Sequence, residues 1–148
     1  MKKYTVNELP EKSARARLMN VPVSIKDSVN VCNFLQGKNL KEAEEYLEAV
    51  IRKEKAIPYR RYLGSISHRP GMGPGRYPIK VSKYVLELLK NVEANAEHQN
   101  LDTDRLIIYS LLVKKGETIK KHMPRAYGRA TPFYKERVHF EIIVKEVE

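Results

Sequence analysis

The chain has 148 residues, 42% of them hydrophobic, and carries a formal net charge of +10 at pH 7. This length is enough for one domain, spanning residues 1–148, with a single core. The charge favours a polyanionic partner, nucleic acid before an anionic membrane. The single cysteine, Cys32, excludes an internal disulfide, and no apolar run approaches the ~18 residues of a membrane span. Without a signal-peptide core at its start, the protein is expected to be cytoplasmic.

The first predicted strand covers residues 14–19, where small or apolar side chains alternate with basic ones. Because strand side chains alternate between the two faces of a sheet, the basic members lie together on one side. The pattern is typical of a short edge strand with a basic outer face. Its two arginines, Arg15 and Arg17, are therefore candidate RNA-binding residues.

Two amphipathic helices are predicted next. Ser24 and an acidic residue three positions later form a start that resembles a capping box, and Gly37 ends the first helix. Asn39 repeats the capping device for a second helix with an apolar stripe. Val29 and Cys32 fall on the apolar face of the first helix. Since no His or Asp context accompanies the cysteine, it is interpreted as a core residue and not as a nucleophile.

The segment 57–78 holds four of the seven glycines and four of the eight prolines, which excludes a helix or a central strand. It contains no acidic residue, and its arginines alternate with tyrosines. Arginine suits phosphates, aromatic faces suit unstacked bases, and glycine lets the backbone approach a ligand closely. We interpret the segment as a basic RNA-binding loop, with a plain linker as the alternative. Its arginines are Arg60, Arg61, Arg69 and Arg76.

A third helix is predicted from Pro78 to about His98, followed by turn residues and an apolar strand over residues 105–113. Because that strand is apolar on both faces, it is expected at the centre of the sheet. The last strand, residues 138–144, alternates, and Glu141 is among its outward-facing residues. The order of elements predicts an α+β fold, a three-stranded antiparallel sheet with three helices packed on one face.

Between the last two strands lies the most basic segment, residues 114–137, with eight Lys or Arg against two Glu. Loops of this length are usually functional or disordered. No helical crossover separates the strands, so we predict an antiparallel hairpin that extends as a basic ribbon and turns at Gly128. Arms of about 11 residues would reach roughly 35 Å. The alternative is a mobile loop that orders only on its partner.

The two basic segments, 57–78 and 114–137, together account for the entire net charge, because the remainder holds 16 basic and 16 acidic residues. Both are expected to be extensions outside the core. The sequence contains no zinc-site spacing, no phosphate-binding loop motif and no nucleophile elbow. We therefore expect no enzymatic activity, no metal and no cofactor.

These features bear on three classes of function. A structural RNA-binding protein fits both basic segments. An architectural DNA-binding protein that uses a basic β-ribbon is the alternative, although it would require a dimer and an apolar wedge at the ribbon tip. An RNA-modifying enzyme is the third class, and neither basic segment supplies an acid/base pair for it.

Two motifs carry a family resemblance. Residues 95–98 read Asn-Ala-Glu-His at a helix end before a Leu-Asp step into a strand, and residues 123–130 read Met-Pro-Arg-Ala-Tyr-Gly-Arg-Ala. Together with the paired helices, they resemble the large-subunit ribosomal protein family called L twenty-two in bacteria and L seventeen in eukaryotes. The insert 57–78 resembles archaeal and eukaryotic members, and the lack of the long eukaryotic C-terminal tail favours an archaeal source.

The resemblance implies a structural constituent of the large ribosomal subunit that lies on large-subunit rRNA near the exit of the peptide tunnel. It also implies neighbouring large-subunit proteins as partners, and a hairpin tip at the tunnel wall beside the nascent polypeptide. The implied tip residues are Arg125, Ala126, Tyr127 and Gly128. The candidate RNA-binding residues of the ribbon are Lys114, Lys115, Lys120, Lys121, Arg125, Arg129, Lys135 and Arg137.

Overall fold

The computed structural model describes residues 4–6 and 9–147. The helices are α1 (Ile25–Leu35), α2 (Leu40–Ile51) and α3 (Ile79–His98), with 3₁₀ turns η1 (Thr103–Arg105) and η2 (Ala126–Gly128). The strands are β1 (Ser13–Val21), β2 (Ile57–Pro58), β3 (His68–Arg69), β4 (Gly73–Arg76), β5 (Leu106–Ile119), β6 (His122–Pro124), β7 (Ala130–Pro132) and β8 (Lys135–Glu146).

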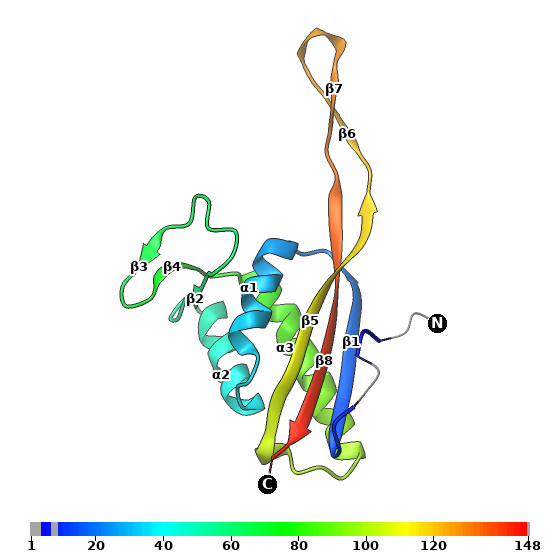
Figure 1. Cartoon of the computed structure of the whole chain (residues 1–148). Coiled ribbons are helices and arrows are strands. Elements are labelled where there is room, and N and C mark those ends of the chain that lie inside the picture. The colour runs from blue at the N-terminus through cyan, green and yellow to red at the C-terminus, as the bar shows by residue number, and fades with distance from the viewer. Residues whose placement is uncertain (1–3, 7–8, 148) are drawn as a thin grey trace.

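The main sheet is antiparallel and three-stranded, in the order β1-β8-β5. All three helices lie on one side of it (Figure 1). α3 packs against β1, α1 packs against β5, and α2 packs against α3. The predicted α+β fold with three helices on one face of the sheet is therefore confirmed.

The prediction that the strand at residues 105–113 is central is wrong, because β8 occupies the centre and β5 is an edge. The turn between α1 and α2 closes part of that edge. The Gly37 amide donates to the Ile108 carbonyl, and the Ile108 amide donates to the Lys38 carbonyl, each at 2.9 Å. These bonds satisfy backbone groups that a further strand would otherwise pair, so an apolar strand is tolerated at the edge.

α1 and α2 begin where their caps predict. The Ser24 hydroxyl accepts a hydrogen bond from the Asp27 amide, and the Asn39 side chain accepts one from the Lys41 amide. Cys32 is buried on α1, as predicted, and burial raises the pKa of its thiol. No helix in the described part of the chain is long and apolar enough to cross a bilayer.

The segment 57–78 is less separate from the core than predicted. β2 and β3 both pair with β4 in a small antiparallel sheet at one end of the body. Ile57 and Tyr59 are only 0% and 4% exposed and belong to the main hydrophobic cluster. The expectation of an extension wholly outside the core is therefore wrong for the start of this segment, which is anchored by two buried side chains.

The ribbon continues the main sheet. β5 pairs with β8 from Leu106 opposite Glu146 to Ile119 opposite Lys135, and β6 pairs with β7 beyond them. Figure 1 shows this paired segment projecting from the body. The register shifts near Gly116, where an added Cβ would lie 3.0 Å from the Arg137 carbonyl oxygen. Glycine permits the two backbones to approach this closely at the base of the ribbon.

Core and ribbon should respond differently to the same substitution. Phe140 is completely buried on β8, whereas Phe133 on the ribbon is 49% exposed. We predict that Phe140→Ala lowers the free energy of unfolding by about 3–5 kcal/mol, because it leaves a cavity in the core. Phe133→Ala should change it by less than about 0.5 kcal/mol. Urea denaturation of both variants measures the difference, and equal losses would place the ribbon in the cooperative core.

Candidate nucleic-acid interface

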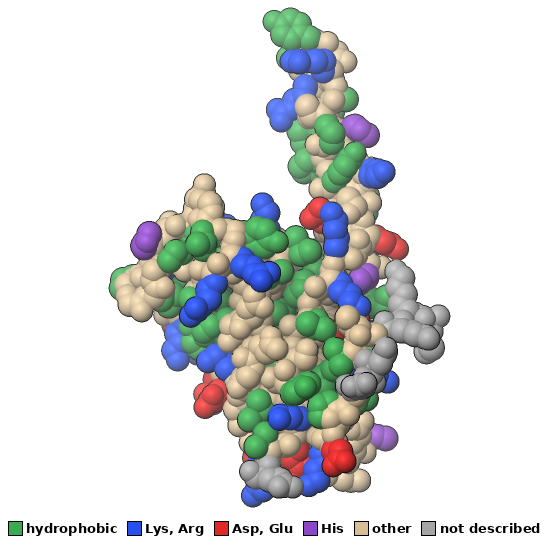
Figure 2. Space-filling view, viewed as in Figure 1, with side chains coloured by type: hydrophobic (Ala, Val, Ile, Leu, Met, Phe, Trp, Pro, Cys, Tyr) green, Lys and Arg blue, Asp and Glu red, His purple; other side chains and the backbone are tan. Residues whose placement is uncertain are grey.

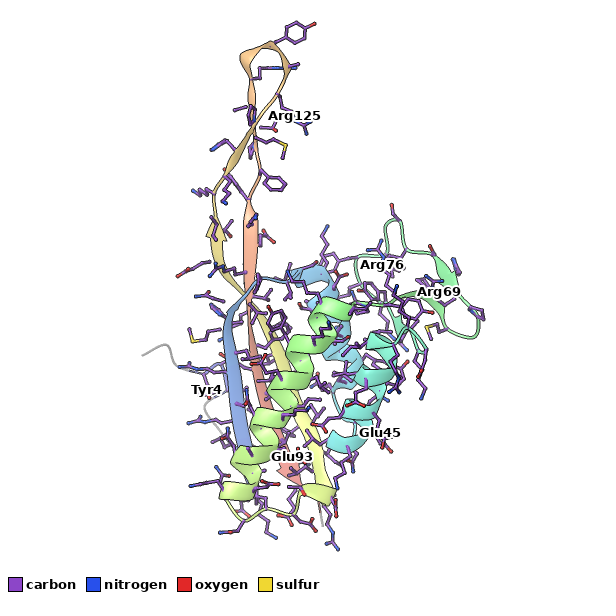
Figure 3. The ribbon with its side chains drawn as sticks, turned by 180° about the vertical axis from the view of Figure 1, so that it is seen from behind. Tyr4, Glu45, Arg69, Arg76, Glu93 and Arg125 are labelled. Atoms are coloured by element: carbon purple, nitrogen blue, oxygen red, sulfur yellow. The ribbon has the colours of Figure 1, made fainter. Side chains whose placement is uncertain are left out.

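The two basic segments project from the same end of the body. Figure 3 shows Arg125 near the far end of the ribbon, and Arg69 and Arg76 on the separate loop. Figure 2 shows Lys and Arg side chains along the ribbon, while basic and acidic side chains mix at the opposite end of the molecule. The fold therefore presents the surplus positive charge on two neighbouring projections.

The ribbon presents most of its basic side chains to solvent. The exposed members are Lys115, Lys120, Lys121, Arg125, Arg129 and Lys135, while Lys114 and Arg137 are partly buried. At the tip the Arg125 amide donates to the Arg129 carbonyl at 2.7 Å, which closes the turn. Gly128 has the predicted positive φ, but Tyr127 has one too, with φ of 59°, and its side chain is 95% exposed. The tip thus holds an aromatic ring out in solvent between two arginines.

Two lysines at the base of the ribbon are engaged within the chain. Lys114 pairs with Glu141 at 3.2 Å, and Lys115 pairs with Glu136 at 2.8 Å. Both are candidate RNA-binding residues, and a phosphate at either position would have to share the ammonium with a carboxylate. The more distal residues of the ribbon are better placed to neutralise phosphates.

Glu141, predicted to face solvent, is only 8% exposed. The amide and hydroxyl of Thr5 both donate to its carboxylate, so the N-terminal segment lies across this part of the sheet. Burial alone would raise the pKa of Glu141, but the bonds from Thr5 and the ammonium of Lys114 outweigh it and lower the pKa. A charged carboxylate is therefore retained in a covered position on the outer face of the sheet.

Arg15 and Arg17 lie on β1, apart from the ribbon tip and the loop. Their guanidinium carbons lie 4.3 and 5.0 Å from the centroid of the Tyr4 ring. A cation over an aromatic face at this distance is attracted to the ring. The N-terminal segment thus covers part of the basic face that the alternating pattern predicted, although Arg17 still lines a small hollow on the sheet together with Lys114.

Asn30, on α1, fixes the backbone of the first two loop arginines. Its side-chain oxygen accepts from the Arg60 and Arg61 amides at 3.0 and 3.1 Å. Its side-chain nitrogen donates to the carbonyls of Arg61 and Lys26, at 3.0 and 2.8 Å. The residue is 2% exposed, and three of its four hydrogen bonds hold this turn while the fourth stays within α1. Sequence reasoning missed Asn30, although a polar residue next to the apolar stripe of a helix, where it is poorly suited, was a usable signal.

Further contacts order the rest of the loop. Tyr59 donates from its hydroxyl to Asp27 at 2.7 Å, and burial together with this bond raises the pKa of Tyr59. The Arg69 guanidinium lies 5.1 Å from the centroid of the Tyr77 ring, and Arg76 donates to the Ser65 carbonyl at 3.0 Å. The loop is thus a preformed structure that carries arginines, which disfavours the plain-linker alternative.

The sequence is similar to a family of known proteins and to several of its members. The family described as Ribosomal protein L22p/L17e matches residues 16–145. A protein of Picrophilus torridus, named large ribosomal subunit protein uL22, is 49% identical over 146 residues, covering 99% of this chain and 97% of its own. The uL22 proteins of Thermoplasma acidophilum and Methanocaldococcus jannaschii are 50% and 42% identical, covering 99% and 97% of this chain and 96% and 94% of their own.

The Asn30 contacts yield a prediction. Asn30→Ala should lower the free energy of unfolding by about 1–3 kcal/mol, because buried backbone groups lose their partners. Hydrogen exchange at the Arg60 and Arg61 amides should become faster, since both donate to Asn30. Asn33→Ala, an exposed position on the same helix, is the matched control and should alter neither property. Unchanged exchange in the Asn30 variant would show that the side chain does not hold the loop.

Glu141 yields a prediction about pH. Because its pKa is lowered in the folded state, its charged form stabilises the fold above the ordinary value of 4.5, and this contribution is lost as the pH falls. Wild type should be more stable than Glu141→Gln at pH 7, and the gap should shrink below about pH 4.5. Denaturation of both proteins at several pH values between 7 and below about 4.5 measures this difference in stability. Glu136→Gln, at a more exposed ion pair, should show little effect at any pH.

Proposed function

The chain belongs to the ribosomal protein L22p/L17e family as an archaeal-type member, and from this premise we propose that it binds large-subunit rRNA near the peptide exit tunnel. Its role is that of a structural constituent of the large ribosomal subunit, not that of an enzyme. The proposal goes beyond the family assignment in naming the surface that meets RNA and the region of the subunit that it reaches.

The segregation of charge carries the RNA-binding proposal. Twelve Lys and Arg residues lie within segments 57–78 and 114–137, which project from one end of the body. Each phosphate that such a residue neutralises releases counterions, so binding is favoured most at low salt. Arginine in addition forms paired, charge-assisted hydrogen bonds to phosphate. The rest of the chain carries equal numbers of basic and acidic residues, so these two segments account for the net positive charge.

The shape of the ribbon supports its proposed reach. A two-stranded ribbon can pass between RNA helices that would exclude a folded domain, and its exposed side chains can meet phosphates on both sides. At its end Tyr127 and the flanking arginines are proposed to line the tunnel wall, where they meet rRNA and the nascent polypeptide. Neighbouring large-subunit proteins are the remaining proposed partners. The family assignment favours RNA over the DNA-architectural alternative.

Salt dependence tests this proposal. For binding to an archaeal large-subunit rRNA, the logarithm of the affinity should fall steeply with the logarithm of salt concentration. Arg129→Ala should reduce the slope by about 0.7–0.9, the contribution of one phosphate contact. The melting temperature should stay unchanged, because Arg129 is exposed on the ribbon.

The matched control is Arg105→Ala, since Arg105 is exposed at the opposite end of β5 and pairs with Asp102. It should leave the slope unchanged. Equal effects of the two substitutions would mean that the ribbon has no special role. Binding that is insensitive to salt would contradict the proposed function altogether.

A further inference from the structure

Two adjoining hollows lie between the base of the ribbon and the loop 57–78. The larger, about 540 Å³, is bounded by the starts of α1, α3 and β8. The smaller, about 270 Å³, is bounded by the start of α1 and by the loop. Both are lined by Ser24 and Lys26, so they adjoin at the beginning of α1, and we refer to the two together as the trough. Figure 1 shows the ribbon and the loop on either side of this helix end.

The trough is lined by four basic side chains from four separate elements of the chain. These are Lys26, Arg76, Lys80 and Lys135. These four cations outnumber its two carboxylates, of which Glu136 pairs with Lys115 and Asp27 accepts a hydrogen bond from the Tyr59 hydroxyl. The trough therefore attracts an anion. Lys26 and Lys80 were not among the predicted RNA-binding residues, because both lie in helices outside the two basic segments and only the fold brings them together.

An exposed tyrosine lines each hollow of the trough. Tyr134 lines the larger hollow and is 48% exposed, and Tyr62 lines the smaller and is 52% exposed. Phosphate-binding cations beside accessible aromatic rings are the combination that binds single-stranded RNA, because an unpaired base can stack on the ring. A wholly electrostatic surface would not need the rings.

The position of Tyr62 is maintained against its backbone preference. Its φ is 58°, in the left-handed region that a bulky side chain rarely adopts. Asn30 binds both the amide and the carbonyl of the preceding Arg61, which holds the turn. Backbone conformations of this kind persist where the surroundings impose them, and they concentrate at functional sites. The structure thus holds an aromatic ring at the edge of a basic trough.

We propose that the trough binds a single-stranded segment of rRNA, with phosphates on Lys26, Lys80 and Lys135 and an unstacked base on Tyr134. The inference rests on the proposed function and adds to it the kind of RNA that the body recognises. Paired bases lie inside a duplex and offer no free face for stacking. The ribbon, in contrast, meets phosphates whether or not their bases are paired.

Two substitutions of Tyr134 in the full-length chain test the stacking. The probes are a short single-stranded RNA of mixed sequence and the duplex that it forms with its complement. Tyr134→Ala should weaken single-strand binding by roughly tenfold and leave duplex binding unchanged, whereas Tyr134→Phe should bind both probes like wild type. Equal losses on both probes, or no loss on either, would overturn the inference.

The lysines are tested by a triple variant, Lys26→Met, Lys80→Met and Lys135→Met. The salt slope for the single strand should fall by about 2, since each phosphate contact with a single strand contributes ~0.7. A control variant carries the same change at Lys12, Lys90 and Lys145. Lys12 and Lys145 lie at the far end of the sheet, and Lys90 lies about 15 Å along α3 from Lys80.

The outcomes separate the two proposals. If the triple variant keeps the wild-type slope while Arg129→Ala loses affinity for rRNA, the trough inference fails and the proposed function stands. If the wild-type chain binds RNA without salt dependence, both fail. A lower slope in the triple variant, with no change in the control, supports the trough.

Discussion

The structure depends on one strand that belongs to two parts of the molecule. β8 begins in the ribbon, opposite Ile119, and ends opposite Leu106, at the end of the sheet farthest from the ribbon. Within the body it pairs with β1 and β5 on its two edges, and its residues Phe140, Ile142 and Val144 are buried under the helices. Because the same ladder of hydrogen bonds runs through core and ribbon, the packing of the core fixes where the ribbon leaves the body. Gly116 permits the close backbone approach at that point.

The sequence predicted the fold class and the positions of the helices, because caps and apolar stripes are local signals. It did not predict the strand order, since β5 looks central in composition while its edge is closed by the turn after α1. It also placed Glu141 in solvent. The alternation of side chains along β8 carries no information about the N-terminal segment, which covers this carboxylate. Both errors arise where residues distant in sequence provide the burial.

The candidate site, like the fold, was predicted from the sequence only in part. The exposed cations of the ribbon and loop are visible in the sequence, because charge that segregates into two segments needs no tertiary information. Asn30 and the trough were not foreseen, since their meaning depends on contacts made by distant elements. Asn30 reaches from a helix to the loop 31 residues further on, and Lys80 and Lys135 line one hollow from separate elements. A family resemblance indicates the partner, whereas the arrangement of side chains indicates which part of that partner each surface can hold.

The central claim is that the sheet anchors a ribbon whose tip reaches RNA far from the body. Photo-crosslinking on intact translating ribosomes tests it most directly, with a probe at Tyr127 and a second at Lys90 on the exposed face of α3. The account predicts that the probe at Tyr127 labels tunnel-wall rRNA or the nascent chain, and that the probe at Lys90 labels neither. A Tyr127 probe that labels only partners on the outer surface of the subunit would contradict it.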